Sequence, residues 1–218
     1  NFAKYIFIVY DKIKQNVSKK NLKKVKVIYN DVYNNKKHEK KEFSIKKTLK
    51  LVYVGRLIKG KSPEIIIKSL MKYSNLSLSI YGDGPEKFKL KELTQKLNLS
   101  NRVFFKGFKN NEDLIKVLKK YDVFVYYDKF FEFPKTVMEA IFAGLPLIIN
   151  KKPLISLKEF KSFKIFWVDD CQKSYINKIQ NIVDNKYNLS KISKHNLIII
   201  KKLVSSSSDK NYLKKLVE

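Results

Sequence analysis

The sequence has little of what covalent or metal-based stabilisation requires. Its 218 residues include one cysteine and two histidines, so an internal disulfide is excluded and a usual structural zinc site lacks ligands. No apolar run approaches the roughly 18–20 residues of a membrane-spanning helix, and no secretory signal pattern is present. Hydrophobic residues make up 44% of the chain, which is enough for a packed core. We therefore expect a soluble globular protein of the cytoplasm, with a peripheral position at the cytoplasmic membrane face as the alternative.

Arginine is almost absent although the chain is strongly basic. The net charge is +27, yet all basic residues except Arg56 and Arg102 are lysines. Proteins that read nucleic acids rely on arginine for base edges and stacking, so we expect no specific nucleic-acid binding. A basic binder of nucleic acid or anionic membranes stays a competing hypothesis that rests on net charge alone. Where lysine is the usual cation, Arg56 indicates a site that needs a planar group with several donors.

Glycine and proline are confined to the middle of the chain. All six glycines lie between positions 55 and 144, and all five prolines lie between 63 and 153. Short β-branched or aromatic runs predict buried strands at 49–54, 76–81, 103–105, 122–126 and 146–149. Helical apolar spacing predicts helices at 63–73, 85–97, 112–119 and 134–143, three of which open with proline. This alternation predicts an α/β fold, a Rossmann-like open parallel sheet with helices on both faces.

The two ends of the chain have other patterns. At the start we predict a strand at 3–10, a helix at 11–20, a strand at 25–29 and an exposed polar connector at 30–47. Residues 154–218 contain no glycine or proline, which predicts a mainly helical end. There we expect a last strand at 163–168, helices at 172–183 and around 189–204, and a terminal helix after the serine run 205–208, because serine is a good N-cap.

Ligands of a doubly wound sheet bind outside the carboxyl ends of its strands. The first strand of the predicted sheet is followed by the loop from Gly55 to Lys61, in which Arg56 and Lys61 flank a short glycine-containing stretch. Two cations on one loop can converge on a single anion. This loop therefore predicts a phosphate site.

The helix predicted from Pro134 provides a second anion site. A proline at the first helical position leaves the amides of Lys135 and Thr136 pointing outward at the positive end of the helix. Glu139 shares a helix face with both residues. A carboxylate one turn beyond bound phosphates could accept the two hydroxyls of a ribose, so the implied ligand is a nucleotide diphosphate.

Taken together and in order, these loops resemble a known family. The segments LVYVGRLIKGK, SIYGDGPE, VFFKGF, YDVFVYY and EFPKTVMEAIFAGLPLI are similar to the C-terminal half of family-4 (group 1) glycosyltransferases, retaining enzymes that use nucleotide sugars and have the GT-B fold. The resemblance implies a remnant of the N-terminal domain and interdomain linker at 1–47, a nucleotide-sugar-binding Rossmann-like domain at 48–203 and a C-terminal helix at 204–218. It also implies that an acceptor-binding N-terminal domain is missing from this chain.

The resemblance assigns roles to individual residues. Arg56 and Lys61 would contact the donor diphosphate and stabilise the leaving nucleotide, with no metal or other cofactor. Glu139 would bind the ribose as the second glutamate of the family's Glu-x7-Glu motif. The other implied donor-binding residues are Gly55 beside Arg56, Gly107 near the base, and Phe133, Pro134, Lys135 and Thr136 around the sugar and phosphates.

Two positions depart from the family pattern. The first glutamate of the motif falls at Phe131, and Glu132 comes one residue later, so either Glu132 serves in the catalytic centre or the sugar contact is altered. Ser62 stands where the family usually has glycine.

Two functional hypotheses follow from the resemblance. The leading one is retaining transfer of a hexosyl-type sugar from a nucleotide-diphosphate sugar to a glycan or lipid-linked acceptor, with this chain as the donor-binding half. The alternative is a non-catalytic Rossmann-like scaffold or partner-binding domain of the same ancestry, because Phe131 departs from the motif.

Overall fold

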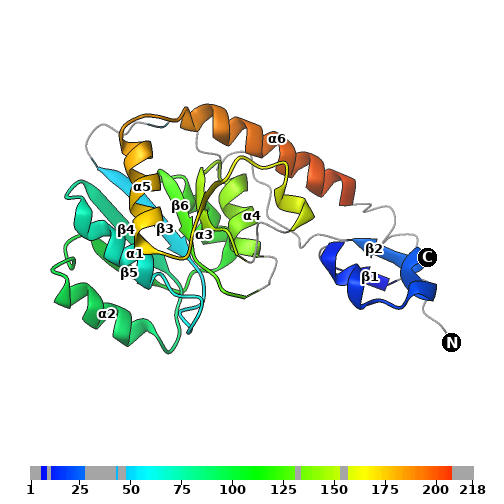
Figure 1. Cartoon of the computed structure of the whole chain (residues 1–218), viewed down its shortest axis with the longest axis horizontal. Coiled ribbons are helices and arrows are strands. Elements are labelled where there is room, and N and C mark those ends of the chain that lie inside the picture. Colours follow the sequence, from blue (N-terminus) through cyan, green and yellow to red (C-terminus); the bar gives the residue numbers. More distant parts are fainter. Residues whose placement is uncertain are drawn as a thin grey trace.

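The computed structural model of the chain describes residues 6–8, 11–27, 43, 48–130, 134–152 and 157–207. Its main body is a six-stranded parallel sheet with helices packed on it, and a second, two-stranded sheet lies near the N-terminus (Figure 1). Within the described ranges, no helix is both long enough and apolar enough to cross a membrane.

The main sheet has the strand order β5-β4-β3-β6-β7-β8, and all neighbouring strands are parallel. The strands are β3 (Leu49–Val54), β4 (Leu76–Tyr81), β5 (Val103–Gly107), β6 (Val123–Tyr126), β7 (Leu147–Asn150) and β8 (Phe166–Val168). The central strands β6 and β7 are buried along their whole length, as expected for a parallel sheet that is covered on both faces. The predicted α/β class and parallel sheet are confirmed.

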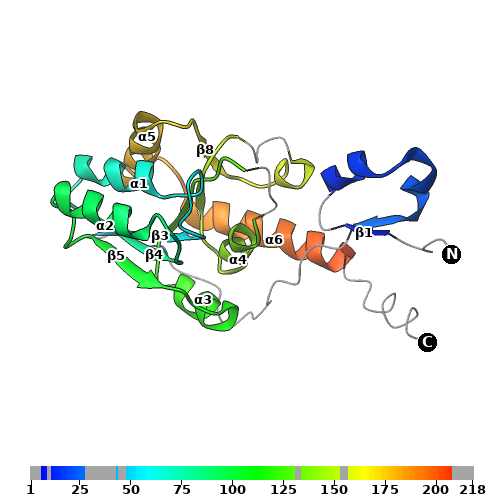
Figure 2. The same ribbon diagram turned by 90° about the horizontal axis from the view of Figure 1, so that it is seen from below.

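In the described ranges, six α-helices accompany the sheet. They are α1 (Glu64–Ser69), α2 (Lys87–Lys96), α3 (Asn111–Leu118), α4 (Lys135–Phe142), α5 (Gln172–Val183) and α6 (Leu189–Ser207), and α1 continues into a short 3-10 turn, Leu70–Lys72. α1 packs against α5, whereas α4 packs against α3 and α6 (Figures 1 and 2). The side-chain amide of Gln172 donates to the Lys68 carbonyl at 2.9 Å, which fixes the start of α5 to α1.

The first 27 residues differ in one respect from the sequence-based expectation. β1 (Ile6–Ile8) and β2 (Val25–Val27) pair in parallel, inside the two strands predicted there. Between them, two 3-10 helices, Asp11–Asn16 and Lys19–Lys24, replace the predicted helix. The second buries no residue, so no packing surface stabilises an α-helix at that point.

Most of the predicted connector at 30–47 lies outside the described residues. Its one described residue, Phe43, is half-buried and packs against the core of the main sheet. The expectation of an exposed connector is therefore wrong at this position. A phenylalanine among polar residues was the available sequence signal, because an aromatic side chain gains free energy when it leaves water.

Helix α6 is longer than predicted. It runs through Ser207, so the expected break at the serine run is wrong for residues 205–207. Leu197 and Ile200 of α6 are buried, and the Ser193 hydroxyl donates to the Gly144 carbonyl at 2.7 Å. Extending a helix that is already anchored adds one hydrogen bond per residue, which outweighs the preference of serine for helix starts. Residues 208–218 lie outside the described residues.

Candidate functional site

The chain order of the strands reverses between β3 and β6, so their carboxyl ends form the switch point of the sheet. The loop at 55–63 follows β3, and the loop that begins at 127–130 follows β6. The two loops touch, because the Lys129 N–H donates to the Gly60 carbonyl at 2.8 Å. This is the edge at which sequence analysis placed the ligand, and its two sides are held together by the backbone.

The loops after β3, β4 and β5 are also joined by backbone hydrogen bonds. The Leu57 N–H donates to the Asp83 carbonyl at 2.9 Å, and the Gly82 N–H donates to the Gly107 carbonyl at 2.8 Å. A Cβ at Gly82 would lie 1.9 Å from the Gly55 carbonyl oxygen, so only glycine allows this approach. A Cβ on Gly107 would meet no atom within 4 Å, so this glycine, which the family resemblance puts near the nucleotide base, lies beside open space.

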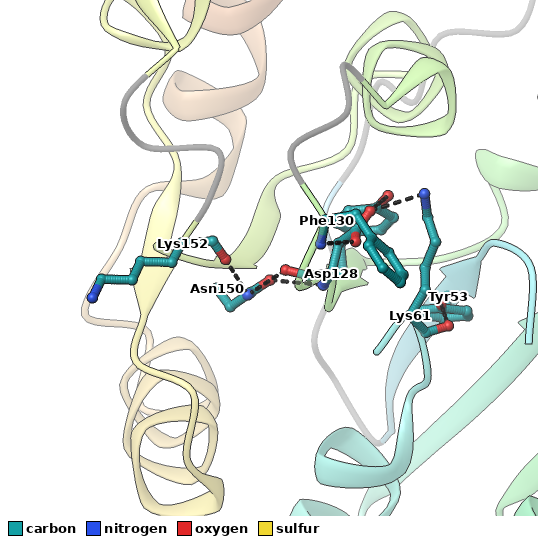
Figure 3. A network of polar contacts seen from close by, with 7 residues as sticks. Tyr53, Lys61, Asp128, Phe130, Asn150 and Lys152 are labelled. Atoms are coloured by element: carbon teal, nitrogen blue, oxygen red, sulfur yellow. Dashed lines mark hydrogen bonds and ion pairs between the residues drawn. The ribbon is translucent and has the colours of Figure 1, made fainter. Parts of the chain in front are cut away.

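Lys61 is a buried cation at the switch point. Its side chain is 9% exposed, and its Nζ lies 2.9 Å from Oδ2 of Asp128, a fully buried carboxylate. The Tyr53 hydroxyl donates to the Lys61 carbonyl at 2.8 Å. Figure 3 shows Lys61 extending from the β3 side toward Asp128 on the β6 side. Arg56 belongs to the same loop as Lys61, but its side chain is exposed.

Asp128 and Asn150 are parts of this site that sequence analysis missed. The Asp128 N–H donates to Oδ1 of Asn150 at 3.0 Å, and Nδ2 of Asn150 donates to the Asp128 carbonyl at 2.8 Å. Asn150 ends β7 and is fully buried. The sequence contained a signal for both residues, because each polar side chain directly follows an apolar run that predicts a strand. In a parallel sheet, ligands bind outside the carboxyl ends of the strands.

Helix α4 begins one residue later than predicted. Pro134 occupies the N-cap position, and Lys135 is the first helical residue. The first hydrogen bond to the Pro134 carbonyl comes from the Val137 N–H at 3.1 Å, so the amides of Lys135 and Thr136 precede the intrahelical ladder. The helix start expected there is confirmed, and its role as an anion site stays a prediction.

Glu139 is nearly completely buried on α4, with 1% of its surface exposed. Its Oε1 lies 3.9 Å from Nζ of Lys135 and has no hydrogen-bond partner. Burial raises the pKa of Glu139 to about 7, and the charge of Lys135 offsets part of that rise. The predicted shared face of Lys135 and Glu139 is confirmed.

The other buried side-chain atom without a partner in the described part of the chain is Oγ of Ser62. Ser62 follows Lys61 in the β3 loop, and Glu139 follows β6 on the opposite side of the switch point. Buried polar atoms normally have partners. The two unpartnered atoms lie on the chain segments that follow β3 and β6, the strands on either side of the switch point.

The sequence matches the family model described as glycosyl transferases group 1 over residues 34–198. The chain belongs to this family. The match includes all six strands of the main sheet and the loops that form the switch point. The family resemblance drawn from the ordered loop segments is thereby confirmed.

Curated relatives of this group 1 glycosyltransferase match it over part of their length. The uncharacterized glycosyltransferase MJ1059 of Methanocaldococcus jannaschii is 40% identical over 101 residues, which cover 44% of this chain and 24% of that protein. The UDP-N-acetylglucosamine–peptide N-acetylglucosaminyltransferase GtfA subunit of Streptococcus agalactiae is 33% identical over 116 residues, or 51% of this chain and 22% of that one. The chain therefore spans well under half the length of these relatives.

Solved structures share the fold of the group 1 chain at low sequence identity. Anabaena HepE in complex with UDP superposes with a TM-score of 0.78 and 17% identity, covering 99% of this chain and 64% of that one. The pneumococcal O-GlcNAc transferase GtfA in complex with UDP and GlcNAc gives a TM-score of 0.71 and 19% identity, covering 97% of this chain and 44% of that one. The GT-B-type architecture is shown by these superpositions.

Three positions of the glycosyltransferase motif lie outside the described residues. They are Phe131, Glu132 and Phe133, which fall between β6 and α4. The choice between Glu132 as a substitute for the first motif glutamate and an altered sugar contact therefore stays open. Of the remaining predicted donor-side residues, Gly55, Arg56 and Lys61 lie on the loop after β3 and Gly107 ends β5. The others, Pro134, Lys135, Thr136 and Glu139, lie at the N-cap and in the first five residues of α4.

Proposed function

We propose that this chain binds a nucleotide-diphosphate sugar and is the donor-binding half of a retaining glycosyltransferase. The observation that carries the proposal is Oε1 of Glu139, a buried carboxylate oxygen without a hydrogen-bond partner, one turn beyond the start of the helix that follows β6 at the switch point. A ribose supplies two hydroxyl donors for such a carboxylate. UDP occupies the structural neighbours HepE and GtfA, which supports a nucleotide as the ligand.

The diphosphate would lie between the β3 loop and the start of α4. Arg56 and Lys61 would meet its oxygens from one side, and the amides of Lys135 and Thr136 would meet them from the other. The helix dipole adds partial positive charge at that end. These groups would stabilise the negative charge that develops on the leaving nucleotide, so the proposal needs no metal.

In the proposed reaction the sugar keeps its anomeric configuration. The bond from the anomeric carbon to the donor phosphate breaks while a bond to an acceptor hydroxyl oxygen forms on the same face, and the acceptor proton passes to the leaving phosphate oxygen. Positioning and electrostatic stabilisation supply the rate enhancement in such a scheme. The residues that touch the leaving group would be Arg56 and Lys61, with Glu132 as a candidate sugar contact.

The acceptor would be bound by an N-terminal domain that is not part of the 218 residues. A relative from Campylobacter jejuni, 30% identical over 122 residues, is named for transfer of N-acetylgalactosamine onto a sugar linked to diphospho-undecaprenol. A relative from Rhizobium meliloti is named for lipopolysaccharide core biosynthesis. These names support a glycan or lipid-linked acceptor for this chain.

Calorimetric titration with UDP, GDP and ADP, each in magnesium and in EDTA, tests the proposal. We expect one nucleotide to bind saturably and equally well in both conditions. Replacing Arg56 by alanine should weaken that binding about 10- to 150-fold, since a charge-assisted contact is worth roughly 1.5–3 kcal/mol. Lys59→Ala is the matched control, because Lys59 is an exposed cation on the same loop and should bind like the unaltered protein.

Two outcomes would count against donor binding. Absence of binding by all three nucleotides at millimolar concentration would favour the scaffold hypothesis. Equal losses in Arg56→Ala and Lys59→Ala would mean that the nucleotide is held by general positive charge and not by the predicted site.

A further inference from the structure

The Lys61–Asp128 pair has a role within the proposed donor site. We propose that Asp128 is a positioning residue that holds the ammonium of Lys61 at the switch point, so that one carboxylate and one donor phosphate share the same cation. The inference rests on the proposed function. It is carried by the 2.9 Å ion pair between two buried side chains that belong to the loops on either side of the sheet's reversal.

Asp128 is itself held in a fixed orientation. Its Oδ1 accepts from the Phe130 N–H at 2.7 Å, and its Oδ2 accepts from the Tyr126 hydroxyl at 2.8 Å in addition to facing Lys61. The Tyr126 carbonyl accepts from the hydroxyl of the buried Tyr175 at 2.7 Å. The carboxylate is therefore aimed at Lys61 by its own neighbours and does not depend on Lys61 for its orientation.

A second set of contacts fixes the backbone of Asp128 from the side opposite Lys61. Asn150 brackets that backbone through its side-chain amide, as Figure 3 shows. The same amide nitrogen also faces the Lys152 carbonyl and, at 3.0 Å, Oδ1 of Asp170, so three acceptors share its two N–H bonds. The contacts thus run across the carboxyl ends of β3, β6, β7 and β8, and Lys61 is at the β3 end of this chain of contacts.

Without Asp128, the Lys61 ammonium should leave the site and should not move closer to the donor phosphates. Breaking an ion pair whose ammonium is only 9% exposed raises the cost of keeping that charge buried, by roughly 3–5 kcal/mol for a broken buried pair. Lysine has a long flexible stem and reaches water easily. Without the carboxylate, Lys61 is expected to swing out, and the diphosphate then loses a pre-placed partner.

A double-mutant cycle on donor-site binding tests the inference. The variants are Asp128→Asn, Lys61→Met and the combination of both, and the probes are pyrophosphate and the nucleoside diphosphate that binds the unaltered protein best. We expect Asp128→Asn and Lys61→Met each to weaken binding about tenfold. The double variant should bind no more weakly than Lys61→Met, because Asp128 acts through Lys61.

Asp169→Asn provides the matched control. It breaks the exposed Lys151–Asp169 ion pair, whose atoms lie 2.7 Å apart at the ends of β7 and β8, and should leave binding unchanged. A merely structural role of Asp128 would give losses that multiply to about a hundredfold in the double variant. That result, or binding by Asp128→Asn as tight as or tighter than that of the unaltered protein, overturns the inference while leaving donor binding intact.

Failure of the proposed function looks different, because then the unaltered protein binds none of the probes. If Asp128→Asn does not fold, Asp128→Ser is the second variant, since its hydroxyl can still accept the Phe130 N–H. In the unaltered protein, the Nζ resonance of Lys61, assigned with Lys61→Met, offers a direct measurement. A protected ammonium that persists and shifts on adding pyrophosphate supports a shared cation, and its loss on binding contradicts it.

Discussion

Glu139 gives the sharpest test of how the site is built. Burial raises the pKa of its carboxyl in the folded chain from 4.5 to about 7, whereas the unfolded chain keeps the ordinary value. Between these two pH values the folded state binds one proton more than the unfolded state. The stability linked to this proton is therefore fully present below pH 4.5 and is lost as the pH rises through about 7.

The size of the effect follows from the width of that window. Stability changes by about 1.4 kcal/mol for each pH unit in which only the folded state holds the proton. Across the window from 4.5 to about 7, the loss is about 3 kcal/mol. For a chain of this size, that corresponds to a fall in melting temperature of about 6 to 12 °C.

Glu139→Gln removes the titration and keeps the shape of the side chain. From pH 4.5 to 8 the unaltered protein should lose about 3 kcal/mol of unfolding free energy that the variant keeps. The variant should therefore gain about 3 kcal/mol relative to the unaltered protein over this range. Urea denaturation at half-unit pH steps measures it. Glu64→Gln is the control, because its hydrogen bond to Lys68 lowers the pKa of the half-exposed Glu64, so this variant should gain nothing over that range.

The same carboxyl connects stability to binding. If ribose hydroxyls donate to Glu139, they favour its charged form, so its pKa falls and a proton is released on binding near pH 6.5. Calorimetry in two buffers of different ionisation enthalpy counts that proton. A Glu139→Gln difference that stays constant within about 0.5 kcal/mol from pH 5 to 8 would refute the reasoning, because it would mean that the carboxyl is not titrating in a buried place.

Four further substitutions test the scaffold of the site by urea denaturation. Gly82→Ala should cost about 3 kcal/mol or more, because its Cβ would meet the Gly55 carbonyl oxygen at 1.9 Å, whereas Gly107→Ala has open space and should cost about 1–2 kcal/mol for its positive φ alone. Arg102→Lys should cost about 1–2 kcal/mol, since one guanidinium nitrogen serves two main-chain carbonyls after α1. Ser193→Ala should cost about 1 kcal/mol through its lost hydrogen bond between α6 and the end of α4.

Most of the fold could be predicted from the sequence, because short stretches of neighbouring residues indicate its strands and helices. The strand bounds at 49–54 and 76–81 agree with β3 and β4 residue for residue, and the helix at 172–183 agrees with α5. Each is a short run in which the spacing of apolar residues alone decides the structure. The extension of α6 through Ser207 was missed because it depends on a helix anchored by residues far away in sequence, such as Gly144.

The candidate site could be predicted from the sequence only in part, because ion pairs join residues that are far apart in the sequence. Arg56, Lys61 and Glu139 were singled out from their places after strands and one turn beyond a helix start, and the structure places Arg56 and Lys61 on the loop after β3 and Glu139 within α4. Nothing in the sequence pairs Lys61 with Asp128, which lies 67 positions later and approaches only because β6 lies beside β3. Burial of Glu139 was likewise invisible, since a helix glutamate is usually exposed.

The large positive net charge says little about the candidate site, because the lysine of that site is paired with a carboxylate. The net charge of +27 comes from lysines, but the lysine that belongs to the candidate site is buried and shares its charge with Asp128. Exposed lysines bind polyanions through a field that salt screens over about 8 Å at physiological ionic strength. Salt screens the interactions of a buried cation much less, and Lys61 is buried and already paired with Asp128. Nucleotide binding at the switch point should therefore persist at salt concentrations that abolish binding of nucleic acid or anionic vesicles, and a salt titration separates a built site from the general charge of the surface.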